Sequence, residues 1–217
     1  MRTPSRVDRE LQAPGIVLPA LDFATEKLIA YEIGYRGRPT SNTSLSVSFY
    51  YDSYSDLRST NVISLSPLLF QLSNSREGSV YGVEAWGDWQ VLRWWRLSAG
   101  VNLLRKNLRL KAGVISAGDN QSVGDDPGYQ LSWRSSFDLP HDIKLDIGFR
   151  AVDGLPTGPI PSYVEAEARI AWQVAPNLEL SLAGYNLLAP RHVEIANPPM
   201  PLQAARRSIY LGLRRTF

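Results

Sequence analysis

The 217-residue sequence lacks cysteine and contains only two histidines, His141 and His192. Without cysteine there is no disulfide and no thiol chemistry, and two histidines leave few candidates for a histidine-based metal site or catalytic triad. The sequence has no run of about 20 apolar residues, which excludes a membrane-spanning helix, and no charged and then apolar signal segment after Met1. Its formal net charge is only +2, so charge indicates no need for nucleic acid as a partner.

Catalytic motifs are missing as well. The sequence contains no G-x-S-x-G, G-x-G-x-x-G, P-loop or H-E-x-x-H motif. His192 and Glu194 in "RHVEI" could form a metal pair, but a loop histidine beside one carboxylate is more often solvated, and Asp125 and Asp126 in "GDDPG" are typical of a turn. We therefore expect no enzyme, no catalytic residue, no metal ligand and no cofactor.

The sequence instead alternates apolar and polar residues with period two, which is typical of β-strands. In residues 43–52, for example, Leu45, Val47 and Phe49 alternate with serines. Residues 163–172 are rich in Ala and Glu and would suit a helix, but their strict alternation predicts a strand. The nine predicted strands are 27–37, 43–52, 79–89, 96–104, 130–139, 143–151, 163–172, 178–186 and 206–217.

The connections between these strands alternate in length. Short connections at 37–42, 91–95, 140–142 and 174–177 alternate with long ones at 53–78, 105–128, 153–162 and 187–205. Strands of roughly ten residues with tight turns on one side and long loops on the other are typical of an outer-membrane barrel, whereas soluble strands average about five or six residues. The predicted fold is all-β: an antiparallel up-and-down transmembrane β-barrel, present as a partial barrel of about nine strands. If the carboxyl terminus is periplasmic, every short turn is periplasmic too.

The two faces of the strands predict two environments. Tryptophans gather around one short turn, and amphipathic rings favour the membrane interface; we expect interface aromatics at Trp86, Trp89, Trp94 and Trp95, with ordinary core residues as the alternative. Charged residues on the other face are expected to pair with each other or with a plug; they are Glu84, Asp88, Arg134, Asp138, Asp146, Arg150, Glu165, Glu167 and Arg169.

Several stretches taken together resemble the TonB-dependent outer-membrane receptors, in the carboxyl-terminal part of the barrel. They are "RTPSRVDREL", "ATEKLIAYEIGYRG", "SFYYDSYSDLRS", "GSVYGVEAWGDWQVLRWWRLSAGVNLL", "IPSYVEAEARIAWQVAPNLELSLAGYNLLAPRHVE" and "RSIYLGLRRTF". The resemblance implies a plugged barrel of about 22 strands, of which these are the last nine. Residues 1–26 would then be an extracellular loop and the end of a preceding strand, and 27–217 the nine strands. Signal peptide, plug domain and the amino-terminal half of the barrel are not in the sequence.

The resemblance implies a function in transport. The complete receptor would lie in the Gram-negative outer membrane and import a ferric siderophore or a similar scarce nutrient, with TonB engaged only through the missing plug. The alternatives are a passive porin or autotransporter-like barrel and, more weakly, an outer-membrane hydrolase. Expected partners are outer-membrane lipid, the missing amino-terminal barrel half, the barrel-assembly machinery and the small-molecule ligand, with no nucleic acid.

Two segments receive specific roles. A last strand that ends in an aromatic resembles the signal read by the barrel-assembly machinery; the residues are Ile209, Tyr210, Leu211, Leu213 and Phe217. Arg215 departs from that pattern, but a basic residue near the interface costs only about 0 to 1 kcal/mol. A basic loop could contact an anionic ligand, although solvated charges or contact with lipopolysaccharide are the more ordinary alternatives; its residues are Arg105, Lys106, Arg109 and Lys111.

Overall fold

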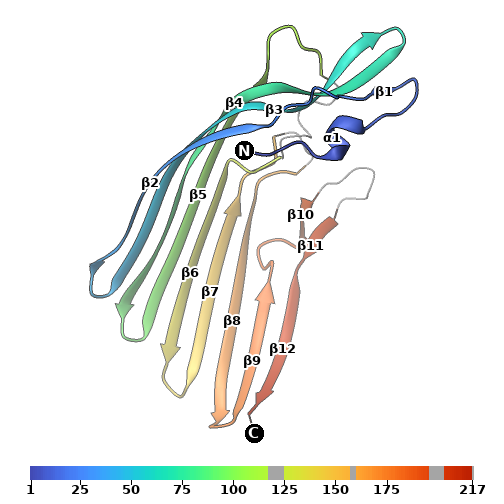
Figure 1. Cartoon of the computed structure of the whole chain (residues 1–217). Coiled ribbons are helices and arrows are strands. Elements are labelled where there is room, and N and C mark those ends of the chain that lie inside the picture. The colour runs from blue at the N-terminus through green and yellow to red at the C-terminus, as the bar shows by residue number, and fades with distance from the viewer. Residues whose placement is uncertain (117–124, 157–159, 196–202, 217) are drawn as a thin grey trace. The chain divides into compact units, whose positions relative to one another are not determined.

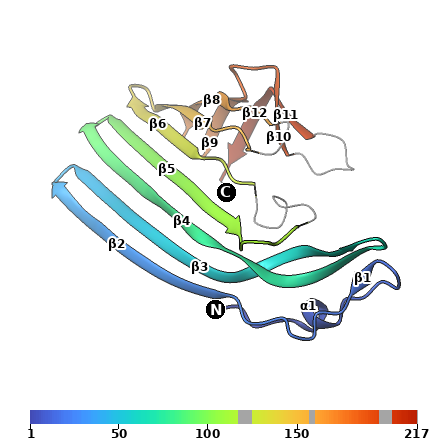
Figure 2. The ribbon, with the colours of Figure 1, turned by 90° about the horizontal axis from the view of Figure 1, so that it is seen from above.

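Nine strands run antiparallel in one sheet and follow the order of the chain (Figures 1 and 2). The computed structural model describes residues 1–116, 125–156, 160–195 and 203–216. This architecture confirms the predicted antiparallel up-and-down sheet of about nine strands. The strands are β2 (Lys27–Thr40), β3 (Thr43–Leu65), β4 (Leu68–Leu92), β5 (Trp95–Leu110), β6 (Tyr129–Leu139), β7 (Ile143–Val152), β8 (Tyr163–Ala175), β9 (Leu178–Tyr185) and β12 (Ser208–Arg215).

The Ala- and Glu-rich segment 163–172 is confirmed as a strand, because it forms most of β8. Its residues pair with β7 on one side and β9 on the other, so that both edges of the strand find backbone partners. Among the described residues, no helix is long and apolar enough to cross a membrane.

The prediction of loops over 53–78 and 105–110 was wrong. β3 and β4 continue as a long hairpin that turns at Ser66 and Pro67, and β5 extends to Leu110. Polar residues of β3 and β4 pair with one another: the Ser59 hydroxyl donates to Asn61 Oδ1 at 2.9 Å, and Asn61 Nδ2 donates to Ser75 Oγ at 2.8 Å. Buried polar groups are tolerated in strands when they are satisfied in this way.

The predicted loop 187–205 also contains secondary structure. β10 (Arg191–Ile195) pairs antiparallel with β11 (Gln203–Arg206) in a two-stranded sheet of its own. Pro198, Pro199 and Pro201 lie between the two strands, in a part of the chain outside the described residues. This hairpin positions His192 and Glu194, which lie on β10.

The chain divides into two compact units, of which the first comprises Met1–Ile33, Phe49–Gly82 and Leu104–Asp125. Its amino-terminal segment forms α1 (Arg6–Glu10), capped by Ser5, and β1 (Val17–Leu18), which pairs parallel with β4. Residues 1–26, expected to be a loop and a strand end, therefore contain a helical turn and a two-residue strand. Ala20, Phe23 and Leu72 form a small buried core beside them.

Asp8 is the charged centre of this amino-terminal segment. Its carboxylate is fully buried, accepts hydrogen bonds from the Ser5 backbone and hydroxyl, and lies 2.8 Å from Arg2 and 3.3 Å from Arg58. Burial alone would raise the pKa of Asp8, but the Ser5 hydrogen bonds and the two guanidinium groups lower it below its usual value. Through its ion pair with Arg58, this buried and charged carboxylate connects α1 to β3.

The second unit comprises Gly34–Ser48, Val83–Leu103 and Asp126–Phe217. Its four short turns lie at the same end of the strands as the end of β12 (Figure 1). This confirms the predicted short connections, which the structure narrows to two or three residues each: 41–42, 93–94, 140–142 and 176–177.

Candidate functional site

One face of the sheet in the second unit is apolar. Residues paired directly across antiparallel strands share a face, and one such row runs unbroken over six strands: Trp95, Phe137, Leu145, Ile170, Leu182 and Leu211. The last three of these side chains are exposed, Ile170 to 44%, Leu182 to 48% and Leu211 to 83%, and the first three are partly exposed. A contiguous exposed apolar face of this kind needs a non-aqueous neighbour.

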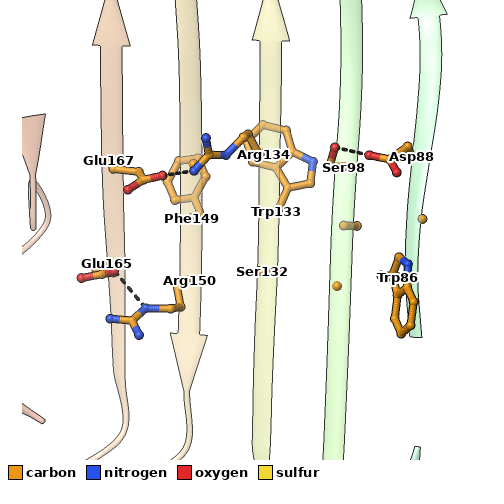
Figure 3. A pocket seen from close by; sticks show the side chains of 14 residues that line it. Trp86, Asp88, Ser98, Ser132, Trp133, Arg134, Phe149, Arg150, Glu165 and Glu167 are labelled. Atoms are coloured by element: carbon orange, nitrogen blue, oxygen red, sulfur yellow. Dashed lines mark hydrogen bonds and ion pairs between the residues drawn. The ribbon is translucent and has the colours of Figure 1, made fainter. Parts of the chain in front are cut away.

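The opposite face of the same strands is polar and ion-paired. Ser98, Arg134, Gly148 and Glu167 form one paired row on β5 to β8. The Arg134 guanidinium donates to Glu167 Oε1 at 2.5 Å across β7 (Figure 3). Gly148 pairs with both residues in the sheet and has no side chain to block this ion pair. A Cβ added at Gly148 would lie 2.9 Å from Glu167 Cγ. A glycine at position 148 therefore leaves the space that the Arg134 and Glu167 side chains occupy.

The adjacent row, two residues along each strand, repeats the arrangement. Gly100, Ser132, Arg150 and Glu165 are paired, and Arg150 Nε donates to Glu165 Oε1 at 2.9 Å. The two rows line an open pocket of about 590 Å³, whose lining also includes Trp86 and Asp88 of β4. Ser98 donates to Asp88 Oδ1 at 2.6 Å, on the β4 side of the pocket (Figure 3).

The pocket is a charged surface rather than a catalytic arrangement. Its acids and bases are already paired with each other, as Arg134 with Glu167 and Arg150 with Glu165. Such partly exposed pairs are each worth only about 0.2 to 1 kcal/mol, so they can be exchanged for another polar partner at little cost. The arrangement can therefore hold a polar partner by hydrogen bonds and ion pairs.

The four tryptophans expected at an interface do not lie together. Trp94 stacks on Trp95 and on Phe137, with ring centroids 6.4 Å and 6.3 Å away, at the short turn between β4 and β5. Trp95 also donates from its indole nitrogen to Ser135 Oγ at 2.7 Å, which covers that buried serine. Trp89 is 48% exposed.

Trp86 differs from the other three. Trp86 is an even position of β4, so it shares the polar face with Glu84 and Asp88. It lines the pocket, and the Arg36 guanidinium lies 5.9 Å from its ring centroid. A cation over an indole face is an attractive contact. Trp86 and Trp89 lie on opposite faces of β4, because one is an even and the other an odd position of the strand. Their proximity in the sequence does not reveal this difference.

The basic residues expected on a loop lie on strand β5 or directly after it. Arg105, Lys106 and Arg109 belong to β5, and Lys111 follows its last residue. Arg109 lies 3.2 Å from Glu77, and Lys111 lies 2.8 Å from Asp56. At least two of the four basic groups therefore already hold a carboxylate within the first unit.

The residues expected to form the assembly signal lie on the edge strand β12, which pairs only with β9 among the described residues. Ile209, Leu211 and Leu213 share the apolar face and are 69%, 83% and 70% exposed. Tyr210 lies on the other face, with its ring 5.8 Å from that of Tyr185. Phe217 lies outside the described residues.

The sequence had suggested a solvated loop histidine at His192, but the structure shows a largely buried one. Its side chain is only 9% exposed, its Nε2 lies 2.9 Å from Glu194 Oε1, and Glu165 of β8 completes the cluster at 3.9 Å. The β10–β11 hairpin brings these residues to β8. No sequence signal connects Glu165 with His192, because the contact depends on where a long connection folds back.

A sequential antiparallel sheet with one exposed apolar face and one ion-paired polar face defines the wall of a membrane β-barrel. A family profile described as "TonB dependent receptor-like, beta-barrel" matches residues 2–187. The chain therefore belongs to the TonB-dependent receptor family, in agreement with the resemblance found in its sequence. That family consists of transport receptors and not of enzymes.

Solved structures of this family have the same fold. The ferric yersiniabactin uptake receptor FyuA from Yersinia pestis matches 90% of the chain with 18% identity and a TM-score of 0.67. The siderophore receptor PiuA from Acinetobacter baumannii matches 88% with 20% identity and a TM-score of 0.72. The ferric-catecholate import receptor Fiu from E. coli K12 matches 90% with 20% identity and a TM-score of 0.69.

The match covers only part of each of these structures. The chain spans 30% of FyuA, 28% of PiuA and 28% of Fiu. A comparison with curated proteins finds no match.

Proposed function

We propose that this chain forms nine strands of the barrel wall of an outer-membrane receptor that imports a ferric siderophore or a similar scarce nutrient by TonB coupling. The observation that carries the proposal is the match of the TonB-dependent receptor barrel to residues 2–187. The names of the similar structures support the substrate class, since they include a ferric yersiniabactin receptor and a ferric-catecholate receptor.

The two faces of the sheet give the proposal a physical form. The exposed apolar row from Trp95 to Leu211 would contact lipid, and the ion-paired face with Arg134, Arg150 and their glutamates would line the lumen. A membrane barrel requires an apolar outer face in contact with lipid, and its lumen is polar. The pocket over Gly100 and Gly148 would then lie where a plug or a passing ligand meets the wall.

The short turns would face the periplasm. Trp89, Trp94 and Trp95 near one of these turns would anchor that rim at the membrane interface, where amphipathic rings are favoured. The opposite, long connections would be extracellular. On that side, the proposed basic contacts for an anionic chelate are Arg105, Lys106, Arg109 and Lys111. To bind the chelate, Arg109 would release Glu77, its present ion-pair partner.

The test measures uptake of radioactive iron chelates in cells that produce or lack the protein carrying this sequence. The proposal expects saturable uptake of one chelate class that disappears when TonB is deleted or the proton gradient is collapsed. Uptake that rises linearly with concentration and ignores TonB would instead identify a passive porin and overturn the proposal.

A matched pair of variants localises the ligand. Arg109→Gln should weaken binding of an anionic chelate, because it removes a charge at the proposed extracellular end of β5. Arg93→Gln removes the same charge from the short turn between β4 and β5 and should leave binding unchanged. Equal effects of the two variants would contradict the proposed orientation.

A further inference from the structure

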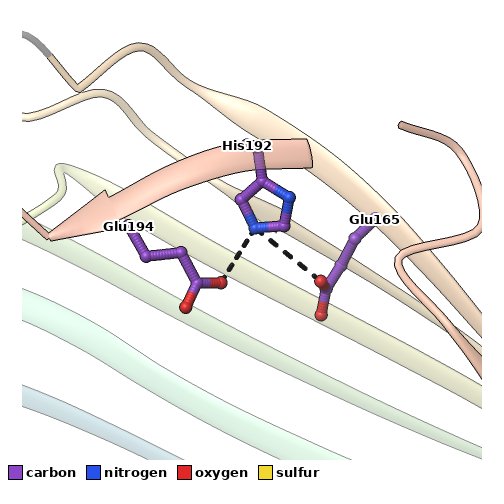
Figure 4. Close-up of side chains that lie close together, drawn as sticks. All are labelled: Glu165, His192 and Glu194. Carbon is purple, nitrogen blue, oxygen red and sulfur yellow. Dashed lines mark hydrogen bonds and ion pairs between the residues drawn. The ribbon is translucent and has the colours of Figure 1, made fainter. Parts of the chain in front are cut away.

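Three metal-ligating side chains meet at the base of the β10–β11 hairpin, apart from the pocket residues that pair across β6 and β8. They are Glu165 on β8 and His192 and Glu194 on β10 (Figure 4). One donor atom from each, the histidine nitrogen and one oxygen of each carboxylate, can be chosen so that all three lie within 4.8 Å of one another. His192 Nε2 is 2.9 Å from Glu194 Oε1 and 3.9 Å from Glu165 Oε2.

Neighbouring side chains hold these three groups in place. The His192 ring stacks on Tyr163 with a centroid separation of 4.2 Å. Arg150 donates from Nε to Glu165 Oε1 at 2.9 Å and from its terminal nitrogen to Glu194 Oε1 at 2.6 Å. Outer contacts of this kind orient the ligands of metal sites and fix them before the ion arrives.

The charge of the cluster favours a cation. The formal charges of Glu165 and Glu194 sum to −2 and that of Arg150 is +1, so these three groups carry a formal net charge of −1. A divalent cation beside His192 Nε2 would be attracted by this excess of negative charge.

The spacing fits a small transition-metal ion. Two donors bound at about 2.1 Å in tetrahedral geometry lie about 3.4 Å apart. The distances from His192 Nε2 to the two carboxylates, 2.9 Å and 3.9 Å, lie on either side of that value. Small side-chain shifts would thus suffice. One imidazole and two carboxylates also select against Mg²⁺ and Ca²⁺, which prefer all-oxygen sites.

We propose that Glu165, His192 and Glu194 bind one divalent transition-metal ion of the Zn²⁺ class, through Nε2 of the histidine and one oxygen of each carboxylate. Water completes the coordination, and Arg150 stays on the carboxylates. The ion connects β10 to β8. Since β10 and β11 form a separate two-stranded sheet among the described residues, the ion fixes this hairpin on the wall. Glu165 also belongs to the pocket lining, but the proposed metal site requires no particular transported substrate.

Zinc binding is tested with the protein carrying this sequence, purified in detergent and freed of metal with a chelator. Titration with Zn²⁺ against a coloured zinc chelator should show a site in the micromolar range or tighter, and Mg²⁺ should not compete. Loss of even an outer partner costs a metal site about 10-fold to 100-fold in affinity, so His192→Asn, Glu165→Gln and Glu194→Gln should each weaken binding at least about tenfold. The matched control, His141→Asn, changes the other histidine of the chain and should bind Zn²⁺ like wild type.

A second measurement needs no variant, in case the altered hairpin misfolds. X-ray absorption at the zinc edge of the zinc-loaded protein reads the ligands directly, and it should show imidazole together with oxygen ligands at about 2.0 to 2.2 Å. If the bound zinc has no imidazole ligand, or if His192→Asn binds Zn²⁺ as tightly as wild type, the cluster is an ion-pair network only and the proposal is overturned.

Discussion

At the residue scale, Gly148 and Asp8 show how single side chains are accommodated. Gly148 leaves room for the ion pair between Arg134 and Glu167, which crosses from β6 to β8. Asp8 is buried and charged because Ser5, Arg2 and Arg58 surround it. In both cases the local contact depends on a neighbour from another element.

Gly148→Ala should lower the free energy of unfolding by about 1 kcal/mol, because the new Cβ displaces Glu167 and crowding of this kind costs about 1 to 3 kcal/mol. In a Glu167→Ala background the same glycine substitution should cost less, since the crowded side chain is gone. Urea unfolding of the four proteins of this double-mutant cycle measures the coupling. Additive effects would show that Glu167 does not occupy the space above Gly148.

Asp8 should make the amino-terminal segment sensitive to acid. Its pKa is lowered in the folded state, so its contribution is fully present above the usual aspartate pKa of about 3.9 and is lost as the pH falls through the lowered value. Proteolysis of residues 1–26 with an acid-tolerant protease should therefore accelerate as the pH falls below about 4.

Asp8→Asn provides the control for that experiment. It should already loosen the segment at neutral pH, by about 1 to 3 kcal/mol for the lost charged hydrogen bonds, and it should remove most of the acid dependence. A variant with the same acid dependence as wild type would assign the effect to another carboxylate.

At the element scale, β12 presents an apolar face and a face with Ser208, Tyr210 and Arg214. Leu211 lies on the exposed apolar face, and its chain neighbour Tyr210 lies on the opposite one. Both positions are at nearly the same height in the sheet. The pair thus separates the effect of lipid contact from that of strand position.

Leu211→Arg should reduce the stability of the assembled barrel by up to about 2 to 4 kcal/mol, the cost of a basic residue on the lipid face at mid-depth. Tyr210→Arg places the same charge on the polar face and should cost much less. Unfolding in lipid vesicles measures both variants. A larger loss for Tyr210→Arg would reverse the assignment of the two faces.

The carboxyl terminus carries a separate prediction about assembly. Phe217→Asp should lower the amount of receptor in the outer membrane far more than ligand binding per assembled receptor, because the residue would lie at the periplasmic rim. Arg215→Tyr should slightly raise assembly by adding an interfacial ring. Surface labelling measures the amount of assembled receptor, and ligand binding is then divided by that amount. Normal assembly with weakened binding in Phe217→Asp would show that the orientation is inverted.

At the scale of the whole molecule, the nine-strand sheet has two edge strands, β2 and β12, among the described residues. Each unpaired backbone group at such an edge costs several kcal/mol in hydrocarbon. Among the described residues of β6 to β9, few apolar side chains are fully buried; they are Val152, Ala166 and Ala171. Stability must come from strand pairing and from lipid.

Expressed alone with an added secretion signal, these 217 residues should aggregate or be degraded, because both edges stay open. Gel electrophoresis with and without heating is the measurement, since a closed barrel migrates differently before heating. A heat-modifiable band would contradict this prediction unless the chain forms a closed oligomer.

The sequence by itself determined the fold class and the order of the nine sheet strands, but it missed β10 and β11. Period-two alternation depends only on the backbone geometry of a strand, so segments such as 163–172 could be assigned without knowledge of their neighbours. The same alternation separates residues of opposite faces, although the grouping of Trp86 with Trp89 overlooked it. The length of β3, β4 and β5 was underestimated, because Ser59, Asn61 and Ser75 look like loop residues until their partners across the strands are known.

Only the tertiary structure decided which side chains meet. Arg134 reaches Glu167 because β7 presents Gly148 between them, and that register follows from the pairing of three strands. Glu165 joins His192 and Glu194 because the connection after β9 folds back as a hairpin. Local propensity and period contain no information about such contacts, since they depend on the free energy of packing segments that are distant in the chain.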